Sequence, residues 1–181
     1  MKILDLYCGL GGWAKGLMDT GHDVIGYDIM DFSKEYPGRL VQTDLLKCDS
    51  FPDADVIVAS PPCTEFSKAS FPKTWKSVMN NPPDIKTALK LFNRVYEIIE
   101  IVKPKYYAIE NVRGAQKFTG RADYHFGSRY IWTNLKNLKI DGNDLYGKWK
   151  MPPSKNRAIL RSIIPYSISR GIGIKLKEVE K

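Results

Sequence analysis

A cysteine that follows two prolines is the first residue of this chain whose type and position could do chemistry. Cys63 lies in the stretch Ser60-Pro61-Pro62-Cys63-Thr64-Glu65-Phe66-Ser67, directly after the apolar run Asp55–Ala59. The run predicts a buried strand, and the prolines end it because they cannot donate to a sheet ladder. The carboxyl ends of strands are where ligands gather in open α/β sheets, so a thiolate here could act as a nucleophile. The alternative is a small buried thiol, since free cysteines are among the most buried residues.

A glycine-rich turn precedes this cysteine near the start of the chain. Lys2–Tyr7 predicts a first strand, Cys8–Gly12 the turn and Trp13–Met18 a helix. Glycines let backbone N–H groups approach a ligand closely at the start of a helix. The dinucleotide fingerprint is not met, so a tight connection without a ligand is the alternative.

Acidic residues follow three other predicted strands. The strands are His22–Tyr27, Arg39–Thr43 and Tyr106–Ile109, and the residues after them are Asp28, Asp44 and Glu110. Asp28 stands about 20 positions after the glycine turn, where a carboxylate can accept two hydrogen bonds from a ribose diol. Asp44 could hold an adenine amino group while Leu45 packs on the ring, although both aspartates could instead be caps or turn residues. With Asp5 and Cys63, these side chains are expected on one rim of the sheet.

The remaining pattern predicts helices and one long irregular segment. Thr64–Pro83 is expected to be irregular, with Lys68, Lys73 and Lys76 interleaved with Phe66, Phe71 and Trp75 as a nucleic-acid-facing lid or a plain surface loop. Asp84 is expected to cap a helix whose apolar stripe runs from Ile85 to Val102. Further predictions are the strands Tyr124–Phe126 and Tyr130–Thr133, a basic helix Ser154–Ser162 and a last helix from Pro165 through Arg170.

Length and composition are those of one soluble globular domain. The 181 residues are 43% hydrophobic and 27% charged, and no apolar run approaches the roughly 20 residues that span a bilayer. Met1–Asp5 is expected to open a strand and not a signal peptide. Three cysteines without paired spacing predict no disulfide framework and a reducing, cytoplasmic compartment. Two histidines and no Cys-x-x-Cys pair argue against a zinc site.

The net charge of +8 is concentrated in the C-terminal third. Residues 1–112 hold 13 Lys and Arg against 15 Asp and Glu, whereas residues 113–181 hold 15 against 5. A one-sided positive field suits a polyanion, because each neutralised phosphate releases counterions. The alternative is a generally basic, solvated surface, and charge alone does not distinguish DNA from RNA.

Three stretches together resemble the cytosine-C5 DNA methyltransferase family. They are Asp5-Leu6-Tyr7-Cys8-Gly9-Leu10-Gly11-Gly12-Trp13, Ser60–Ser67 and Glu110-Asn111-Val112, in the order and at the spacing of that family. The resemblance covers roughly residues 1–132 and continues weakly in Pro165-Tyr166-Ser167. It implies a doubly wound, mostly parallel α/β sheet of the Rossmann-like type that binds S-adenosylmethionine, in a single catalytic domain over residues 1–181.

The resemblance also implies which residues hold the cofactor. Tyr7 would pack on it and the turn with Gly9, Gly11 and Gly12 would cradle its methionine end, with Asp5 and Pro61 among the contacts. Asp28 would take the ribose hydroxyls with Ile29 against the adenine. Asp44 and Leu45 would hold the adenine, and Leu91 would close the pocket.

For the reaction, the resemblance implies covalent catalysis on a cytosine. A Cys63 thiolate added to C6 makes C5 reactive toward a methyl sulfonium, and a protonated Glu110 donates to N3. Arg129 resembles the arginine that contacts the base carbonyl. A base inside a duplex must be flipped out to be reached.

Two departures from the family pattern bear on these expectations. The family has a glutamine before an arginine pair, whereas this chain has His125-Phe126-Gly127-Ser128-Arg129, with one arginine. A short basic segment, residues 133–164, stands in place of the family's large target-recognition domain. Sequence specificity would then be short and loose, supplied by a partner chain or a homodimer, or absent.

The sequence leaves alternatives to a DNA methyltransferase of a restriction-modification system, virus or mobile element. The same chemistry could act on RNA, or the chain could be a non-catalytic subunit that binds cofactor and nucleic acid. An enzyme that methylates an exocyclic amino group fits less well, because such sites carry an aromatic residue where this chain has Cys63.

Overall fold

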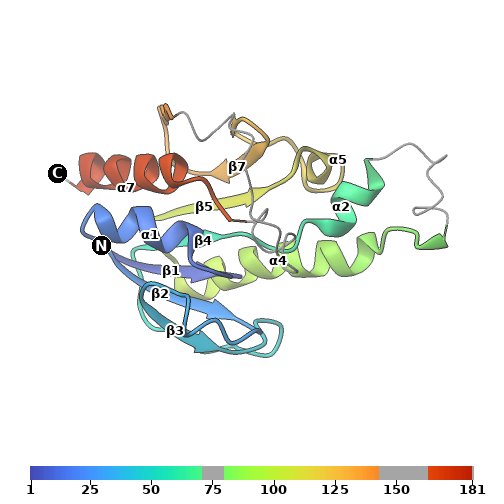
Figure 1. Cartoon of the computed structure of the whole chain (residues 1–181), viewed down its shortest axis with the longest axis horizontal. Helices are drawn as coiled ribbons and strands as arrows, with labels where there is room; N and C mark the ends of the chain where they lie inside the picture. Colours follow the sequence, from blue (N-terminus) through green and yellow to red (C-terminus); the bar gives the residue numbers. More distant parts are fainter. Residues whose placement is uncertain (71–79, 143–162, 181) are drawn as a thin grey trace.

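Within the described residues, seven strands form one sheet in the order β3-β2-β1-β4-β5-β7-β6 (Figure 1). The structure is a computed structural model and describes residues 1–70, 80–142 and 163–180. The strands are β1 (Lys2–Leu6), β2 (Asp23–Asp28), β3 (Arg39–Gln42), β4 (Val56–Ala59), β5 (Tyr106–Asn111), β6 (Tyr124–Phe126) and β7 (Arg129–Thr133). Strands β1 to β5 pair in parallel, and β7 runs antiparallel to both β5 and β6. The predicted doubly wound, mostly parallel sheet is therefore confirmed.

Helices cover both faces of the sheet and bury two separate apolar clusters. They are α1 (Gly12–Asp19), α2 (Thr64–Ala69), α4 (Ile85–Val102), the 3-10 turn η1 (Arg113–Ala115), α5 (Gln116–Thr119) and α7 (Tyr166–Glu180). One cluster contains residues of α1 and α7, and the other contains residues of α2 and α4. The central strands are buried between the clusters, so β4 is apolar throughout and β1 is apolar from Ile3 to Leu6 except for the buried Asp5.

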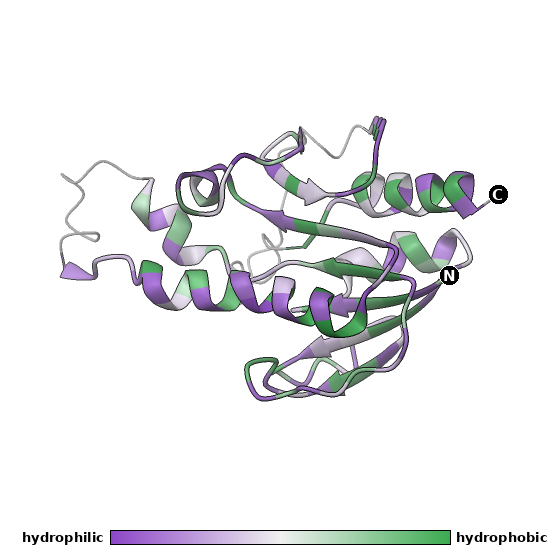
Figure 2. Ribbon diagram, turned by 180° about the vertical axis from the view of Figure 1, so that it is seen from behind, coloured by the Kyte–Doolittle hydropathy of each residue, from purple (hydrophilic) through white to green (hydrophobic). Residues whose placement is uncertain are grey.

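Helix α4 forms as its sequence predicts. The Asp84 carboxylate accepts a hydrogen bond from the Thr87 N–H at 3.0 Å, so one of the unpaired donors of the first turn is satisfied. Phe92, Val95 and Ile98 face the sheet and are fully buried. Green and purple alternate along this long helix in Figure 2, as expected of an amphipathic element.

Helices α1 and α7 lie against each other on the opposite face (Figure 1). A side chain at Gly16 would collide with the side chain and backbone of Ser169, and one at Gly12 would lie 2.6 Å from the backbone nitrogen of Ile164. These glycines let the C-terminal segment pack directly on the first helix. The two ends of the chain therefore build one layer.

Two of the predicted elements differ from the structure. Thr64–Ala69 is not irregular but helical, because Phe66 is fully buried against Phe92 and Phe118 and fixes the segment to the core. The last helix does not stop near Arg170 but continues to Glu180, since Ile168, Ile172 and Leu176 repeat every four residues and pack into the core. In addition, the first strand stops at Leu6, before Tyr7.

Several sequence predictions fall outside the described residues. These are the lid residues Phe71, Lys73, Trp75 and Lys76 and the basic helix Ser154–Ser162. Within the proposed recognition segment, Leu135, Leu138 and Ile140 are buried in the core cluster of α1 and α7. These three side chains thus belong to the packing against the sheet.

Candidate active site

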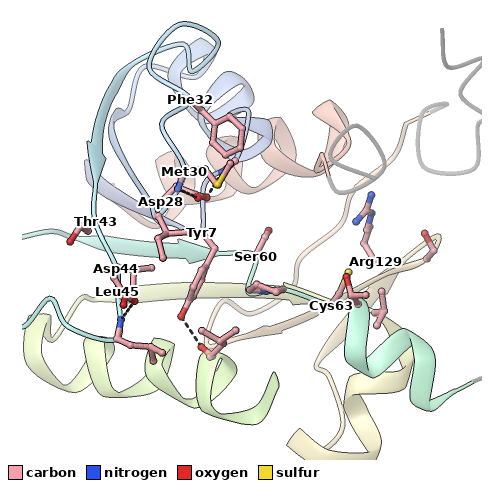
Figure 3. Close-up of a pocket in the computed structure, with 18 residues that line it drawn as sticks. Tyr7, Asp28, Met30, Phe32, Thr43, Asp44, Leu45, Ser60, Cys63 and Arg129 are labelled. Atoms are coloured by element: carbon pink, nitrogen blue, oxygen red, sulfur yellow. Dashed lines mark hydrogen bonds between the residues drawn. The ribbon is translucent and has the colours of Figure 1, made fainter. Parts of the chain in front are cut away.

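A cavity of about 800 Å³ opens at the carboxyl ends of the parallel strands (Figure 3). Its walls come from the loops after β1, β2, β3, β4 and β5, from the β6–β7 hairpin and from one residue of α4. Asp28 and Asp44 lie toward one end in Figure 3, whereas Cys63 and Arg129 lie together at the other. The volume suits a small molecule, and the two ends differ in chemistry.

Asp28 organises the turn at the first end. Its Oδ2 accepts the Gly9 N–H at 3.0 Å, and its Oδ1 accepts the Met30 N–H at 2.9 Å. Gly9 has φ +50°, a backbone conformation that glycine adopts without a steric cost. A carboxylate oxygen has more than one acceptor position, so a hydroxyl can still bond to Asp28.

Asp44 lies on a loop that α4 holds in place. The Asp44 Oδ1 accepts the Leu46 N–H at 3.0 Å. Arg94, a residue of α4 that is 8% exposed, donates from Nε to the Leu45 carbonyl and from Nη2 to the Cys48 carbonyl, both at 2.8 Å. The guanidinium therefore anchors this wall of the cavity from behind.

Tyr7 forms the floor between the two ends. It has φ +55°, and its hydroxyl donates to the Leu91 carbonyl at 3.0 Å. Burial raises the pKa of the Tyr7 phenol well above its usual range, so the group stays protonated and keeps this hydrogen bond. The bond joins the glycine turn to α4.

The loop that carries Cys63 is held by three hydrogen bonds from neighbouring elements. The Asn111 amide Nδ2 donates to the Pro61 carbonyl at 2.9 Å, and the Trp13 indole Nε1 donates to the Ser60 hydroxyl at 2.9 Å. The Ser60 N–H donates to the Leu6 carbonyl at 3.1 Å. Because the two prolines offer no N–H, these contacts determine where the half-buried Cys63 side chain lies.

Glu110 and Arg129 form an ion pair next to Cys63. The Arg129 Nη1 donates to the Glu110 Oε1 at 3.2 Å, and its Nη2 donates to the Ile163 carbonyl at 3.0 Å. Glu110 is 4% exposed. Burial raises the pKa of the Glu110 carboxyl, and the Arg129 charge opposes that rise. A carboxyl with a raised pKa keeps its proton to higher pH and can donate it.

The charges of Glu110 and Arg129 also affect the pKa of the Cys63 thiol. Burial is the main cause that raises its pKa, and the negative charge of Glu110 adds to the rise. The positive charge of Arg129 lowers the pKa. Protonation of Glu110 would remove the unfavourable charge, so a protonated acid and a thiolate favour each other in this site.

Comparison with protein families identifies the group to which this fold and these strand-end motifs belong. The model of the family of C-5 cytosine-specific DNA methylases matches residues 1–125, which contain β1 to β5 and both the cysteine loop and Glu110. The chain belongs to this family.

Curated methylases match about three fifths of the chain. The type II methyltransferase M.FnuDI of Fusobacterium nucleatum is 28% identical over 122 residues, which are 63% of this chain and 33% of that protein. A probable DNA (cytosine-5)-methyltransferase of Frog virus 3 (isolate Goorha) is 31% identical over 116 residues, 61% of this chain and 53% of the viral protein. The chain spans about a third of the length of the first curated relatives that it matches.

A solved structure supports the fold. The methyltransferase EhMeth of Entamoeba histolytica superposes with a TM-score of 0.50 at 19% identity, over 78% of this chain and 55% of that chain. No helix among the described residues is long and apolar enough to cross a membrane. Nor do the described residues contain a group of three His, Cys, Asp or Glu side chains that could hold a metal ion.

The cavity at the carboxyl ends of the parallel strands brings most of the predicted site residues together. Those that line it are Tyr7, Gly9, Asp28, Ile29, Asp44, Leu45, Cys63, Leu91 and Arg129. Glu110 does not line it but reaches it through its ion pair with Arg129. The predicted rim therefore holds Asp28, Asp44 and Cys63 directly and Glu110 indirectly.

Four predicted residues do not line the cavity. Asp5 is fully buried and accepts a hydrogen bond from the Tyr36 hydroxyl at 3.1 Å, and burial raises its pKa. Gly11 is buried against the ring of Pro37, and Pro61 is buried. Gly12 packs against Ile164 and lines a small hollow beside the cavity.

Sequence reasoning missed several residues of the cavity. Met30, Phe32, Thr43, Leu46 and Ser128 line it and were not predicted. Met30 is 57% exposed beside the predicted Ile29, which is 62% exposed, and this is unusual for two consecutive large apolar residues. The position of Met30 directly after Ile29 is the sequence signal that could have added it to the predicted apolar surface for the adenine.

Proposed function

We propose that this chain transfers a methyl group from S-adenosylmethionine to C5 of cytosine in DNA, through a covalent adduct with Cys63. The observation that supports this most strongly is the composition of one cavity. Carboxylates suited to a nucleoside lie at one end, and a thiol beside a Glu–Arg pair lies at the other. Such a cavity can hold a nucleoside-type methyl donor and a base at the same time.

The residues at the first end fit the cofactor. Asp28 can accept hydrogen bonds from the ribose hydroxyls, and Asp44 can accept one from the adenine amino group. The exposed side chains of Ile29 and Met30 offer apolar area for the adenine ring. When bound, S-adenosylmethionine supplies an electrophilic methyl group on a sulfonium.

The residues at the second end fit a cytosine. In the proposed reaction the Cys63 Sγ forms a bond to C6, the 5,6 double bond opens, and Glu110 gives its proton to N3. C5 then carries the electron density that forms the new carbon–methyl bond, while the methyl–sulfur bond of the donor breaks and S-adenosylhomocysteine is the product. Loss of the C5 proton to a base, departure of the Cys63 thiolate and return of the N3 proton to Glu110 restore the ring. Arg129 would contact the base carbonyl and hold Glu110.

Target recognition is proposed for residues other than those that pack into the core. We assign it to the rest of the segment 133–164, residues 143–162, or to a partner chain, because Leu135, Leu138 and Ile140 are buried in the core. The single catalytic domain over residues 1–181 is part of the same proposal.

Adduct formation with 5-fluorocytosine tests the proposal. Fluorine at C5 cannot leave as a proton does, so the base should stay bound to Cys63 after methyl transfer. We expect a denaturation-resistant adduct with DNA that contains 5-fluorocytosine in the presence of S-adenosylmethionine, and none with Cys63→Ala, which should still bind the cofactor.

An RNA arm and a direct transfer assay separate the alternatives. Adducts on RNA of the same sequence, without adducts on DNA, would assign the chemistry to RNA. Absence of both adduct and methyl transfer, together with intact cofactor binding, would indicate a non-catalytic subunit.

A further inference from the structure

A second hollow, of about 590 Å³, adjoins the Cys63 end of the cavity. Val112 and Ser128 line both spaces. The second hollow continues along α2, the η1–α5 segment and the β6–β7 hairpin. It therefore lies directly beside the place where the proposed target base reacts.

The lining of the second hollow is suited to an anion. Arg113 and Lys117 are both exposed and both line it, and its described lining residues include no Asp or Glu. Ser67 and Ser128 add hydroxyl groups, which can donate hydrogen bonds to an oxyanion. A phosphodiester carries one negative charge and two outer oxygens, and this lining complements both features.

Core packing holds the walls of the second hollow. A side chain at Gly114 would lie 2.5 Å from the Phe66 carbonyl oxygen, so η1 packs directly on α2. The rings of Phe66 and Phe118 lie 5.9 Å apart between centroids, and Phe66 is fully buried. Arg113 and Lys117 are thus carried on a segment that is fixed against α2.

Helix α2 joins the second hollow to the nucleophile. The Ser67 N–H donates to the Cys63 carbonyl at 2.9 Å, which places these residues one helical turn apart. Cys63 lines the first cavity and Ser67 the second hollow. A nucleotide whose base reaches Cys63 would have its own backbone near Ser67.

A flipped cytosine stays attached to its own sugar and phosphates, so an enzyme that acts on it needs an anion site next to the base site. Two other hollows among the described residues fit this need less well. A small one of about 50 Å³ shares Tyr7, Gly9 and Ser60 with the cavity but has no cationic residue in its described lining. Another, near Lys2, shares no described lining residue with the cavity.

We propose that the second hollow binds a backbone phosphodiester of the DNA strand beside the target cytosine, with Arg113 and Lys117 as its cationic contacts. This inference rests on the proposed function, because it assumes that the cavity receives a base from DNA. It assigns to the described catalytic fold a part of the DNA affinity that does not depend on base sequence.

The salt dependence of DNA binding tests this inference separately from the chemistry. We would measure the dissociation constant for a short cytosine-containing duplex by fluorescence anisotropy, between about 50 and 200 mM salt. The variants are Arg113→Gln, Lys117→Gln and the double variant. Arg39→Gln and Lys2→Gln are matched controls, since both residues are exposed at the amino ends of β3 and β1, on the opposite edge of the sheet.

Loss of the one phosphate contact in the double variant should reduce the slope of log affinity against log salt by about 0.9 for a duplex, on any sequence. Each single variant should lose part of that slope, whereas Arg113→Lys and the two control variants should keep the wild-type slope. An unchanged slope in the double variant, an equal loss in the controls, or a loss with RNA alone would overturn the inference.

The 5-fluorocytosine adduct assay separates this inference from the proposed function. A wild-type adduct with an unchanged slope in the double variant would remove only the phosphate site. No wild-type adduct, together with the expected loss of slope, would remove only the proposed chemistry.

Discussion

Arg129 and Glu110 join two strands that run in opposite directions. Arg129 begins β7 and Glu110 lies near the end of β5, and their side chains meet at 3.2 Å between Nη1 and Oε1. Because β7 runs antiparallel to β5, the start of β7 lies beside the end of β5. This arrangement brings Arg129 to the Glu110 carboxyl at the rim of the parallel strands. The positive charge of Arg129 lowers the pKa of both Glu110 and Cys63.

Replacement of Arg129 by Gln should move the pH profile of methyl transfer to higher pH. The Arg129 charge lowers the pKa of both Cys63 and Glu110, so its loss raises both values. Less thiolate is then present at a given pH, and the rising limb shifts upward, while Glu110 keeps its proton longer and shifts the falling limb in the same direction. At neutral pH we expect a loss of roughly 10-fold or more. Rates measured from pH 6 to 10 check this, and a profile that only drops in height would contradict it.

Replacement of Asp5 by Asn should flatten the pH dependence of stability. Burial raises the pKa of Asp5 in the folded chain, so the folded state binds a proton that the unfolded state has released. The resulting stability is complete below the unfolded pKa of Asp and is lost as pH rises through the raised folded value. The slope is at most about 1.4 kcal/mol per pH unit. Urea unfolding at a series of pH values, from below the unfolded pKa of Asp upward, measures how the stability of wild type and of Asp5→Asn depends on pH. The exposed Asp53→Asn is the control. Parallel curves for all three proteins would refute the prediction.

Replacement of Arg94 by Met should weaken cofactor binding, although the Arg94 side chain does not line the cavity. Arg94 holds the Leu45 and Cys48 carbonyls, whereas its acidic partners Asp49 and Glu97 are largely exposed. We expect a loss of about 1–3 kcal/mol in the free energy of unfolding, from the two carbonyl hydrogen bonds. Calorimetric titration with S-adenosylmethionine should show weaker binding for Arg94→Met and partial recovery for Arg94→Lys. Lys90→Met, an exposed change one turn earlier on α4, is the control. Wild-type affinity in Arg94→Met would show that the loop needs no such anchor.

Replacement of Gly16 by Ala should loosen the layer formed by α1 and α7. The added methyl group meets the backbone and side chain of Ser169, and the backbone cannot move aside without shifting α7. Overpacking of this kind costs about 1–3 kcal/mol. Thermal unfolding and the rate of proteolysis within residues 166–180 measure the effect, with the exposed Lys86→Ala on α4 as control. If the Ala variant unfolds at the wild-type temperature, the close contact of the two helices is not needed for stability.

Local patterns were sufficient for most of the elements and failed at two of them. The apolar runs and turn residues predicted seven strands and the capped helix α4, because burial on both faces and an Asp cap leave a direct mark in the sequence. Thr64–Ala69 carries no such mark. It is helical because Phe66 packs against aromatic residues far along the chain, which no local pattern records.

The sequence by itself determined which side chains could do chemistry and at which strand ends they stand, since strand ends and glycine turns follow from short-range backbone preferences. It placed Asp28, Asp44, Cys63 and Glu110 at such ends and Arg129 beside a short strand. Only the tertiary structure decided that Asp5 lies inside the core, that Arg129 pairs with Glu110, and that Arg94 anchors the Asp44 loop from behind. These outcomes depend on burial and on contacts between residues distant in sequence, and both arise only when the sheet and its helices pack together.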